Sequence, residues 1–186
     1  MAGPRMPDTS GPNLVVLAQR GEADALGALY DLHYRAIFRY FRARVGNWHL
    51  AEDLTSDVFR RMLAGLPQYR PMGLPFRAWL FRIAHNVLVD HYRKESGRMS
   101  VELQETEQQG QSAADPASVV EHKLTMEQAY RALFELEPSQ RDVLALRFLS
   151  GLSLREVALA LNRTEASVKA LQQRGLAALR LTLVPE

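Results

Sequence analysis

The chain has 186 residues, of which 47% are hydrophobic and 24% are charged. This composition is typical of one or two folded domains, and it excludes a chain that is disordered throughout or built of membrane spans. Because the sequence contains no cysteine, disulfides, cysteine zinc sites and thiol catalysis are excluded as well. Apolar runs stay well below the roughly 18 residues of a membrane helix, and the N-terminus lacks an apolar signal core. We therefore expect a cytoplasmic protein with no membrane insertion.

Charge is spread unevenly along the chain, although the formal net charge is only +2. Residues 26–96 carry eleven arginines and lysines against six acidic residues, a balance of +5. Residues 97–117 carry Arg98 against four acidic residues, a balance of −3. Most single charges simply face solvent, but a basic segment of this length favours a polyanionic partner such as a nucleic acid.

The first part of the chain predicts a bundle of helices. Residues 1–12 are rich in proline and glycine, and we expect them to be disordered. From Leu14, apolar residues recur at three- and four-residue spacing. This spacing predicts helices over about 14–20, 25–45, 50–64 and 75–94. Glycines follow the first three segments, and Pro75 suits the first turn of the fourth. Sustained alternation with a period of two is missing, so we predict a helical domain over residues 13–95.

The rest of the chain predicts a linker and a second helical domain. Residues 96–117 are rich in Ser, Gln, Glu and Gly and lack aromatic residues, which indicates an acidic, flexible linker. A second helical set extends over residues 118–182. Within it, Ser139 and Asp142 have the spacing of a capping box, in which side chains bond free N–H groups at a helix start. The predicted fold is all-α, with two small helical domains.

The last third of the chain predicts a helix-turn-helix. Ser153 and Glu156 have capping-box spacing, and an amphipathic helix follows them. Asn162 and Arg163 break the pattern, and Thr164 is a suitable N-cap for a second helix. That helix is expected to bury Val168, Leu171 and Leu179. Its solvent-facing residues are expected to be Arg163, Glu165, Ser167, Lys169, Gln172 and Gln173. Any helical hairpin gives a similar pattern, but this layout matches the motif whose second helix reads DNA.

The predicted helix over residues 75–94 has two faces. One face is apolar and suits burial: Leu80, Ile83, Ala84, Val87 and Leu88. The other carries Arg82, Asn86, Asp90 and Arg93. Arginines neutralise phosphates, asparagine bonds a base edge, and aromatic rings stack on unpaired bases, so the mixture suits single-stranded or melting DNA. An aromatic residue at helical spacing is more often core, and we expect Trp79 to be at least partly core.

An amphipathic helix start lies at residues 52–61, where acidic residues precede an apolar stripe and two arginines. Acidic residues favour the positive end of any helix, so only its context makes this segment a candidate partner surface.

Enzymatic patterns are missing from the sequence. The five histidines, His33, His49, His85, His91 and His122, have no metalloprotease spacing, and six residues separate His85 from His91, which places them on different helix faces. Phosphate-binding loops and nucleophile elbows are missing too. We therefore predict neither an enzyme nor a cofactor or metal site.

Four stretches of this sequence together resemble a known family. They are the segment from Leu29-Tyr30 to Phe41, residues 51–59 (AEDLTSDVF), residues 76–86 (FRAWLFRIAHN), and residues 136–141 (LEPSQR) continuing through the helix-turn-helix. In this order and spacing the chain resembles the extracytoplasmic-function (ECF) sigma factors, two-domain members of the sigma-70 family of bacterial RNA polymerase subunits. The likeness extends from Leu14 to Arg180.

The resemblance implies a promoter-recognition subunit for core RNA polymerase, contacting the β′ clamp helices and the β flap. It implies that clamp docking uses Asp53, Leu54, Asp57, Val58, Phe59 and Arg61. Capture of an unstacked base in the promoter −10 element would use Tyr69, Arg70, Arg77, Trp79, Arg82, Asn86, Asp90 and Arg93. Recognition of the −35 duplex would use Arg163, Thr164, Glu165, Ser167, Lys169, Gln172, Gln173 and Arg174. The linker would thread the polymerase, and an anti-sigma factor would control the protein in a stress or envelope response.

Two other functions stay open from the sequence. A stand-alone helix-turn-helix regulator would bind duplex DNA without polymerase and would not need the surface at residues 52–61. A helical nuclease would need clustered metal-binding carboxylates or histidines, and the sequence does not offer them.

Overall fold

The computed structural model describes residues 12–98 and 118–183, and every regular element within them is helical. The prediction of an all-α fold is confirmed. We call residues 12–98 the N-terminal half and residues 118–183 the C-terminal half. Pro12, the last residue of the predicted disordered N-terminus, begins the first helix. Residues 1–11 and most of the predicted linker lie outside the described residues.

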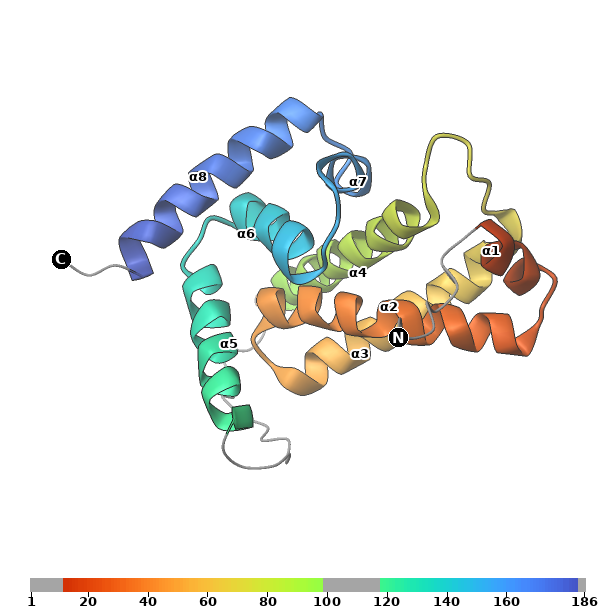
Figure 1. Cartoon of the computed structure of the whole chain (residues 1–186), viewed down its shortest axis with the longest axis horizontal. Coiled ribbons are helices and arrows are strands. Elements are labelled where there is room, and N and C mark those ends of the chain that lie inside the picture. Colours follow the sequence, from red (N-terminus) through yellow and green to blue (C-terminus); the bar gives the residue numbers. More distant parts are fainter. Residues whose placement is uncertain (1–11, 99–117, 184–186) are drawn as a thin grey trace, which may run out of the picture.

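The N-terminal half contains four α-helices and one short 3-10 helix (Figure 1). These are α1 (Pro12–Gln19), α2 (Ala23–Val45), α3 (Trp48–Gly65), η1 (Leu66–Gln68) and α4 (Phe76–Arg98). The predicted helices are all present. Helix α4 continues past its predicted end at residue 94 and takes up the first residues of the predicted linker.

Glycine and asparagine together make the turn between α2 and α3. Gly46 has φ 66°, a conformation that costs glycine little. The side chain of Asn47 then caps α3 by accepting a hydrogen bond from the Leu50 N–H at 3.0 Å. The turn lets α3 fold back along α2, and the two helices pack against each other.

Helix α1 is fixed to the end of the helical bundle. Its Val15 and Ala18 are buried against Leu29 and Leu66. The Gln19 side chain donates hydrogen bonds to the carbonyls of Leu66 at 2.9 Å and Tyr69 at 2.8 Å. The start of the loop between η1 and α4 is therefore held by α1.

The C-terminal half contains four α-helices and a π-helical turn. These are α5 (Ser118–Phe134), α6 (Pro138–Leu144), η2 (Ala145–Leu149), α7 (Leu154–Ala160) and α8 (Glu165–Leu183). The predicted capping pair of Ser139 and Asp142 is wrong: Glu137 caps α6, and its carboxylate accepts from the N–H groups of Ser139 and Gln140. Asp142 is instead buried.

The two halves share a hydrophobic core. Helix α4 packs against α3 on one side and against α7 on the other, and η2 packs against α2 (Figure 1). One contiguous cluster of buried side chains includes Phe41 and Phe81 of the N-terminal half and Leu146 and Val157 of the C-terminal half. We call the contact between the halves the seam.

Candidate nucleic-acid interface

The helix-turn-helix forms as predicted. Ser153 and Glu156 make a reciprocal capping box: the Ser153 hydroxyl accepts from the Glu156 N–H at 3.2 Å, and the Glu156 carboxylate accepts from the Ser153 N–H at 2.7 Å. Asn162 has φ 51° in the turn, a conformation that asparagine tolerates better than most residues. Thr164 caps α8 by accepting from the Ser167 N–H at 3.2 Å. Local sequence thus sets both helix starts.

Helix α8 buries one face and presents the other to solvent. Val168 and Leu171 are buried in the core. Among the predicted −35 residues, six are exposed: Arg163, Thr164, Glu165, Lys169, Gln173 and Arg174. Ser167 and Gln172 are half-buried, and Gln172 accepts a hydrogen bond from Arg147 at 3.1 Å. The exposed groups are long and polar, so this face can reach phosphates and base edges.

Three predicted −10 residues, Tyr69 and Arg70 after η1 and Trp79 in the first turn of α4, pack or form hydrogen bonds within the N-terminal half. Tyr69 is buried, and its hydroxyl donates to the Leu74 carbonyl at 2.8 Å. Its ring contacts Phe76 and Trp79, with centroids 5.6 and 4.8 Å away. Trp79 is half-buried against the core, as expected. Arg70 is exposed and donates to the carbonyls of Pro67 and Tyr69.

Two predicted −10 arginines contact the C-terminal half. Arg77 donates a hydrogen bond to the Ser150 carbonyl. Arg82 donates to the Leu159 carbonyl through Nε at 3.2 Å and through Nη2 at 2.6 Å. Both guanidinium groups are therefore engaged by main chain of the helix-turn-helix half.

The later part of α4 leaves its polar groups more accessible. Asn86 and Arg93 are exposed. Asp90 accepts from Arg61 at 2.9 Å and from Arg93 at 3.2 Å, and the hydrogen bond from Arg61 lowers the pKa of Asp90 below its usual value. Arg61 also pairs with Asp57 at 3.0 Å. This guanidinium links a predicted clamp-docking residue on α3 to a predicted −10 residue on α4.

The predicted clamp-docking residues on α3 differ in their exposure to solvent: the apolar ones are buried and the charged ones are accessible. Leu54, Val58 and Phe59 are buried in the core. Asp53 is exposed, and Asp57 and Arg61 are half-buried. Only the charged members of the set are therefore available to a partner in this structure.

A polar cluster in the seam was missed by sequence reasoning. Asp142 of α6 forms an ion pair with Arg44 of α2 at 2.9 Å and accepts a hydrogen bond from the Tyr40 hydroxyl at 3.0 Å. His85 Nδ1 lies 3.2 Å from the Tyr40 oxygen and 4.0 Å from Asp142 Oδ2. Burial raises the pKa of Tyr40 and lowers the pKa of His85, because it disfavours their charged forms. We call Tyr40, Arg44, His85 and Asp142 the seam cluster.

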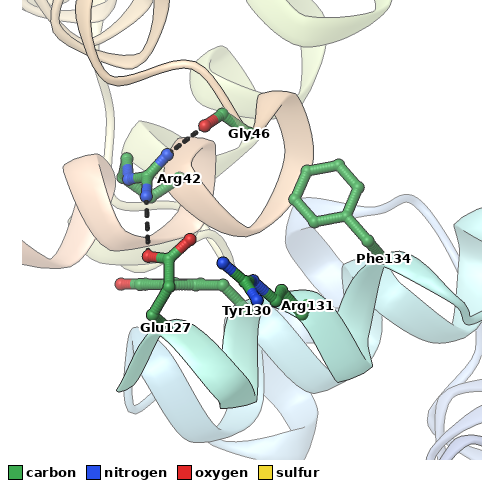
Figure 2. Close-up of a pocket in the computed structure, with 6 residues that line it drawn as sticks. All are labelled: Arg42, Gly46, Glu127, Tyr130, Arg131 and Phe134. Atoms are coloured by element: carbon green, nitrogen blue, oxygen red, sulfur yellow. Dashed lines mark hydrogen bonds and ion pairs between the residues drawn. The ribbon is translucent and has the colours of Figure 1, made fainter. Parts of the chain in front are cut away.

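A small pocket lies where α5 meets the turn after α2 (Figure 2). It has a volume of about 230 Å³. Arg42 at its edge donates to the Gly46 carbonyl and pairs with Glu127 at 3.3 Å. The same guanidinium lies over the rings of Trp48 and Tyr130, 5.6 and 5.3 Å from their centroids. The ion pair between Arg42 and Glu127 is thus a second ionic contact between the halves.

Metal clusters and membrane-spanning helices are absent from the described residues, 12–98 and 118–183. No group of three or more His, Cys, Asp or Glu side chains there is placed to hold a metal ion. No helix in those two segments is long and apolar enough to cross a membrane.

Two family models match the chain. The model of Sigma-70 region 2 matches residues 29–98, and that of Sigma-70, region 4 matches residues 132–181. The first stretch contains α3 and α4, and the second contains the helix-turn-helix.

Curated relatives are similar over most of this chain. The ECF RNA polymerase sigma factor BldN of Streptomyces coelicolor is 37% identical over 163 residues, which are 88% of this chain and 62% of that protein. The chain thus spans less than two thirds of the length of this relative. The ECF RNA polymerase sigma factor SigD of Mycobacterium tuberculosis is 32% identical over 176 residues, which are 92% of this chain and 82% of that protein.

Solved structures with the same fold include two complexes. CnrH in complex with the cytosolic domain of CnrY aligns with a TM-score of 0.72 and 25% identity, covering 94% of this chain and 97% of that one. The sigma factor RpoE, in complex with the anti-sigma factor NepR from Bartonella quintana, aligns with a TM-score of 0.66 and 20% identity, covering 84% of this chain and 95% of that one.

Proposed function

This chain belongs to the ECF sigma factors of the sigma-70 family, and from that premise we propose that it directs core RNA polymerase to promoters and helps to melt them. The observation that carries the proposal is the pairing of two modules in one chain. All the −10 candidates lie within residues 29–98, and all the −35 candidates lie within residues 132–181. Polymerase and promoter DNA share the cytoplasm, and we place the activity of this protein there.

We assign clamp docking to the charged residues of α3. Asp53 is exposed, and Asp57 is fixed by Arg61. Neighbouring carboxylates on one helix face suit a partner surface that presents basic side chains. The buried Leu54, Val58 and Phe59 support this face from the core.

We assign strand capture to α4 and duplex reading to α8. Asn86 offers a donor and an acceptor for one base edge, while Arg77, Arg82 and Arg93 offer charge for the phosphates around it. Lys169, Gln173 and Arg174 are exposed on α8 and suit the −35 major groove.

We extend the proposal to control by a protein inhibitor of the anti-sigma kind. The support is that CnrH, which shares 25% identity and the fold with this chain, was solved in complex with a domain of another protein, CnrY. A binding partner that covers α4 or α8 would block the assigned DNA contacts.

The test is transcription in vitro with bacterial core polymerase and a pool of genomic promoter fragments. We expect initiation at discrete sites only when both core and this protein are present. Tight duplex binding by the protein alone, without any activation of core, would contradict the proposal and favour a stand-alone regulator.

Variants separate the two assigned steps. Asp53→Ala with Asp57→Ala should weaken core binding by about tenfold or more, through loss of complementary charge. Asp31→Ala, which removes an exposed carboxylate from α2, is the matched control. Asn86→Ala should leave core binding intact and reduce open-complex formation. Unchanged open-complex formation on every promoter would remove Asn86 from the proposal.

A further inference from the structure

The pocket between α5 and the turn after α2 contains a buried positive charge that its neighbours satisfy only in part. We call its lining residues the α5 pocket: Arg42, Gly46, Glu127, Tyr130, Arg131 and Phe134 (Figure 2). The Arg42 side chain is only 10% exposed. Its guanidinium donates to the Gly46 carbonyl and to Glu127, while its Nε is buried and has no hydrogen-bond partner. Because an unpaired buried donor costs free energy, Arg42 favours a further acceptor.

The charges around the α5 pocket favour an anion as that acceptor. Arg131 is exposed at its edge. Burial raises the pKa of Tyr130, while the positive charges of Arg42 and Arg39 act to lower it, so both charges are felt there. The acidic residue of the lining is Glu127, whose side chain is 50% exposed and whose carboxylate lies 3.3 Å from Arg42. Since strong pairs of this kind span about 2.7–2.9 Å, a second carboxylate can compete with Glu127 for Arg42.

Aromatic rings form the apolar part of the α5 pocket. The Tyr130 ring lies next to the Arg42 guanidinium, with 5.3 Å between the guanidinium carbon and the ring centroid. Figure 2 shows the Phe134 ring across the pocket from Arg42. This ring lies so close to Gly46 that a Cβ atom there would be 3.2 Å from it. Flat apolar surfaces beside a cation suit a ligand with one aromatic ring and one negative charge.

The size of the α5 pocket limits its ligand to a small molecule. Its volume is about 230 Å³. Sites for drug-sized ligands have roughly 300–1,000 Å³, so this one has room for about a single ring with its acidic group. Inorganic phosphate would meet the charge of Arg42 but would leave the rings of Tyr130 and Phe134 uncovered.

We propose that the α5 pocket binds a small aromatic carboxylate of the benzoate class. The carboxylate accepts hydrogen bonds from Arg42 and Arg131, and the ring packs against Phe134 and Tyr130. The site contains none of the residues to which we assign clamp docking or DNA contacts, so the proposal is independent of the proposed function.

Benzoate is the probe for a direct test on the full chain. Isothermal titration calorimetry should give a dissociation constant on the order of 1 mM, as expected for so small a ligand. Benzoate at about ten times that concentration should raise the melting temperature by about 3–6 °C. Benzamide keeps the ring without the charge, and acetate at equal ionic strength keeps the charge without the ring. Each should bind at least about tenfold more weakly than benzoate.

The variant Glu127→Gln removes the carboxylate that competes for Arg42. It should tighten benzoate binding by about threefold, whereas a merely structural ion pair predicts no gain in affinity. Glu135→Gln is the matched control, because it removes the same charge from an exposed position just after α5 and should bind benzoate like the wild type. Arg131→Gln, which removes an exposed cation from the pocket edge, should weaken binding by about threefold.

Three results would overturn the assigned site. One is the lack of both binding heat and a melting shift with benzoate. Another is equal binding of benzoate, benzamide and acetate. The third is an equal effect of Glu127→Gln and Glu135→Gln on affinity, each variant being shown to fold by its thermal unfolding curve without ligand. Since these measurements use neither polymerase nor DNA, their failure is separate from a failure of the proposed function.

Discussion

His33 shows how one buried side chain makes stability depend on pH. It lies on α2, with its ring 5.6 Å from that of Phe76. Burial, together with the positive charge of Arg77, lowers the pKa of His33 from 6.5 to about 4. The folded protein therefore keeps His33 neutral in a range where the unfolded chain takes up a proton.

The first prediction follows from this difference. Because the folded pKa lies below the unfolded one, the contribution of His33 to stability is lost as pH falls from about 6.5 to about 4. Between pH 7 and pH 5 the free energy of unfolding should fall by about 2 kcal/mol on account of this group. In urea unfolding, the fall in the free energy of unfolding between pH 7 and pH 5 should be smaller for His33→Gln than for the wild type, by about 2 kcal/mol.

His49 provides the matched control for this measurement. It lies on the exposed surface of α3, with 77% of its side chain accessible. We expect His49→Gln to keep the pH slope of the wild type. If His33→Gln also keeps that slope, His33 is not held neutral in the folded protein.

At the scale of elements, helix starts in this chain are set by local caps. The Ser153 and Glu156 pair satisfies two backbone N–H groups at the start of α7. Ser153→Ala should lower the free energy of unfolding by about 1 kcal/mol. Ser56→Ala, which removes a hydroxyl bonded to a carbonyl within α3, should change it by less than about 0.5 kcal/mol. Urea unfolding of both variants checks this, and equal effects would contradict a special role for the cap.

Elements with local determinants were predictable, and contacts between distant elements were not. The helix-turn-helix was predicted because its caps and apolar spacing lie within a few residues of each other. The burial of Leu54 and Val58 also agrees with their spacing, although the family resemblance had placed them on the docking surface. Asp142 had a plausible local partner in Ser139, while its actual partner Tyr40 is 102 residues away. No local pattern encodes such a pair.

At the scale of the whole molecule, the two halves are held together by more than their covalent link. Buried apolar side chains from both belong to one cluster, and ion pairs from Arg42 and Arg44 cross the seam. Removing this apolar surface from water favours packed halves over separated halves. The contact should therefore persist when the chain between the halves is cut.

The third prediction tests that persistence. A specific protease site inserted between residues 98 and 118, then cleaved, should give two fragments that elute together in gel filtration without polymerase. Addition of Asp142→Asn should shift part of the material to separate peaks. Separate elution of the unsubstituted fragments would show that the seam does not hold on its own, while insertion without cleavage controls for the added residues.

The shared core also links the melting temperature of the protein to its activity in transcription initiation. Substitutions that fill space or add contacts between α4 and α7 would raise the melting temperature of the isolated protein, and such stabilising changes are easy to find in most proteins. Here they would also strengthen the hold of the C-terminal half on Arg77 and Arg82, two residues to which we assign phosphate contacts. Laboratory evolution for thermostability alone would thus enrich variants in which these two arginines are less free to reach DNA.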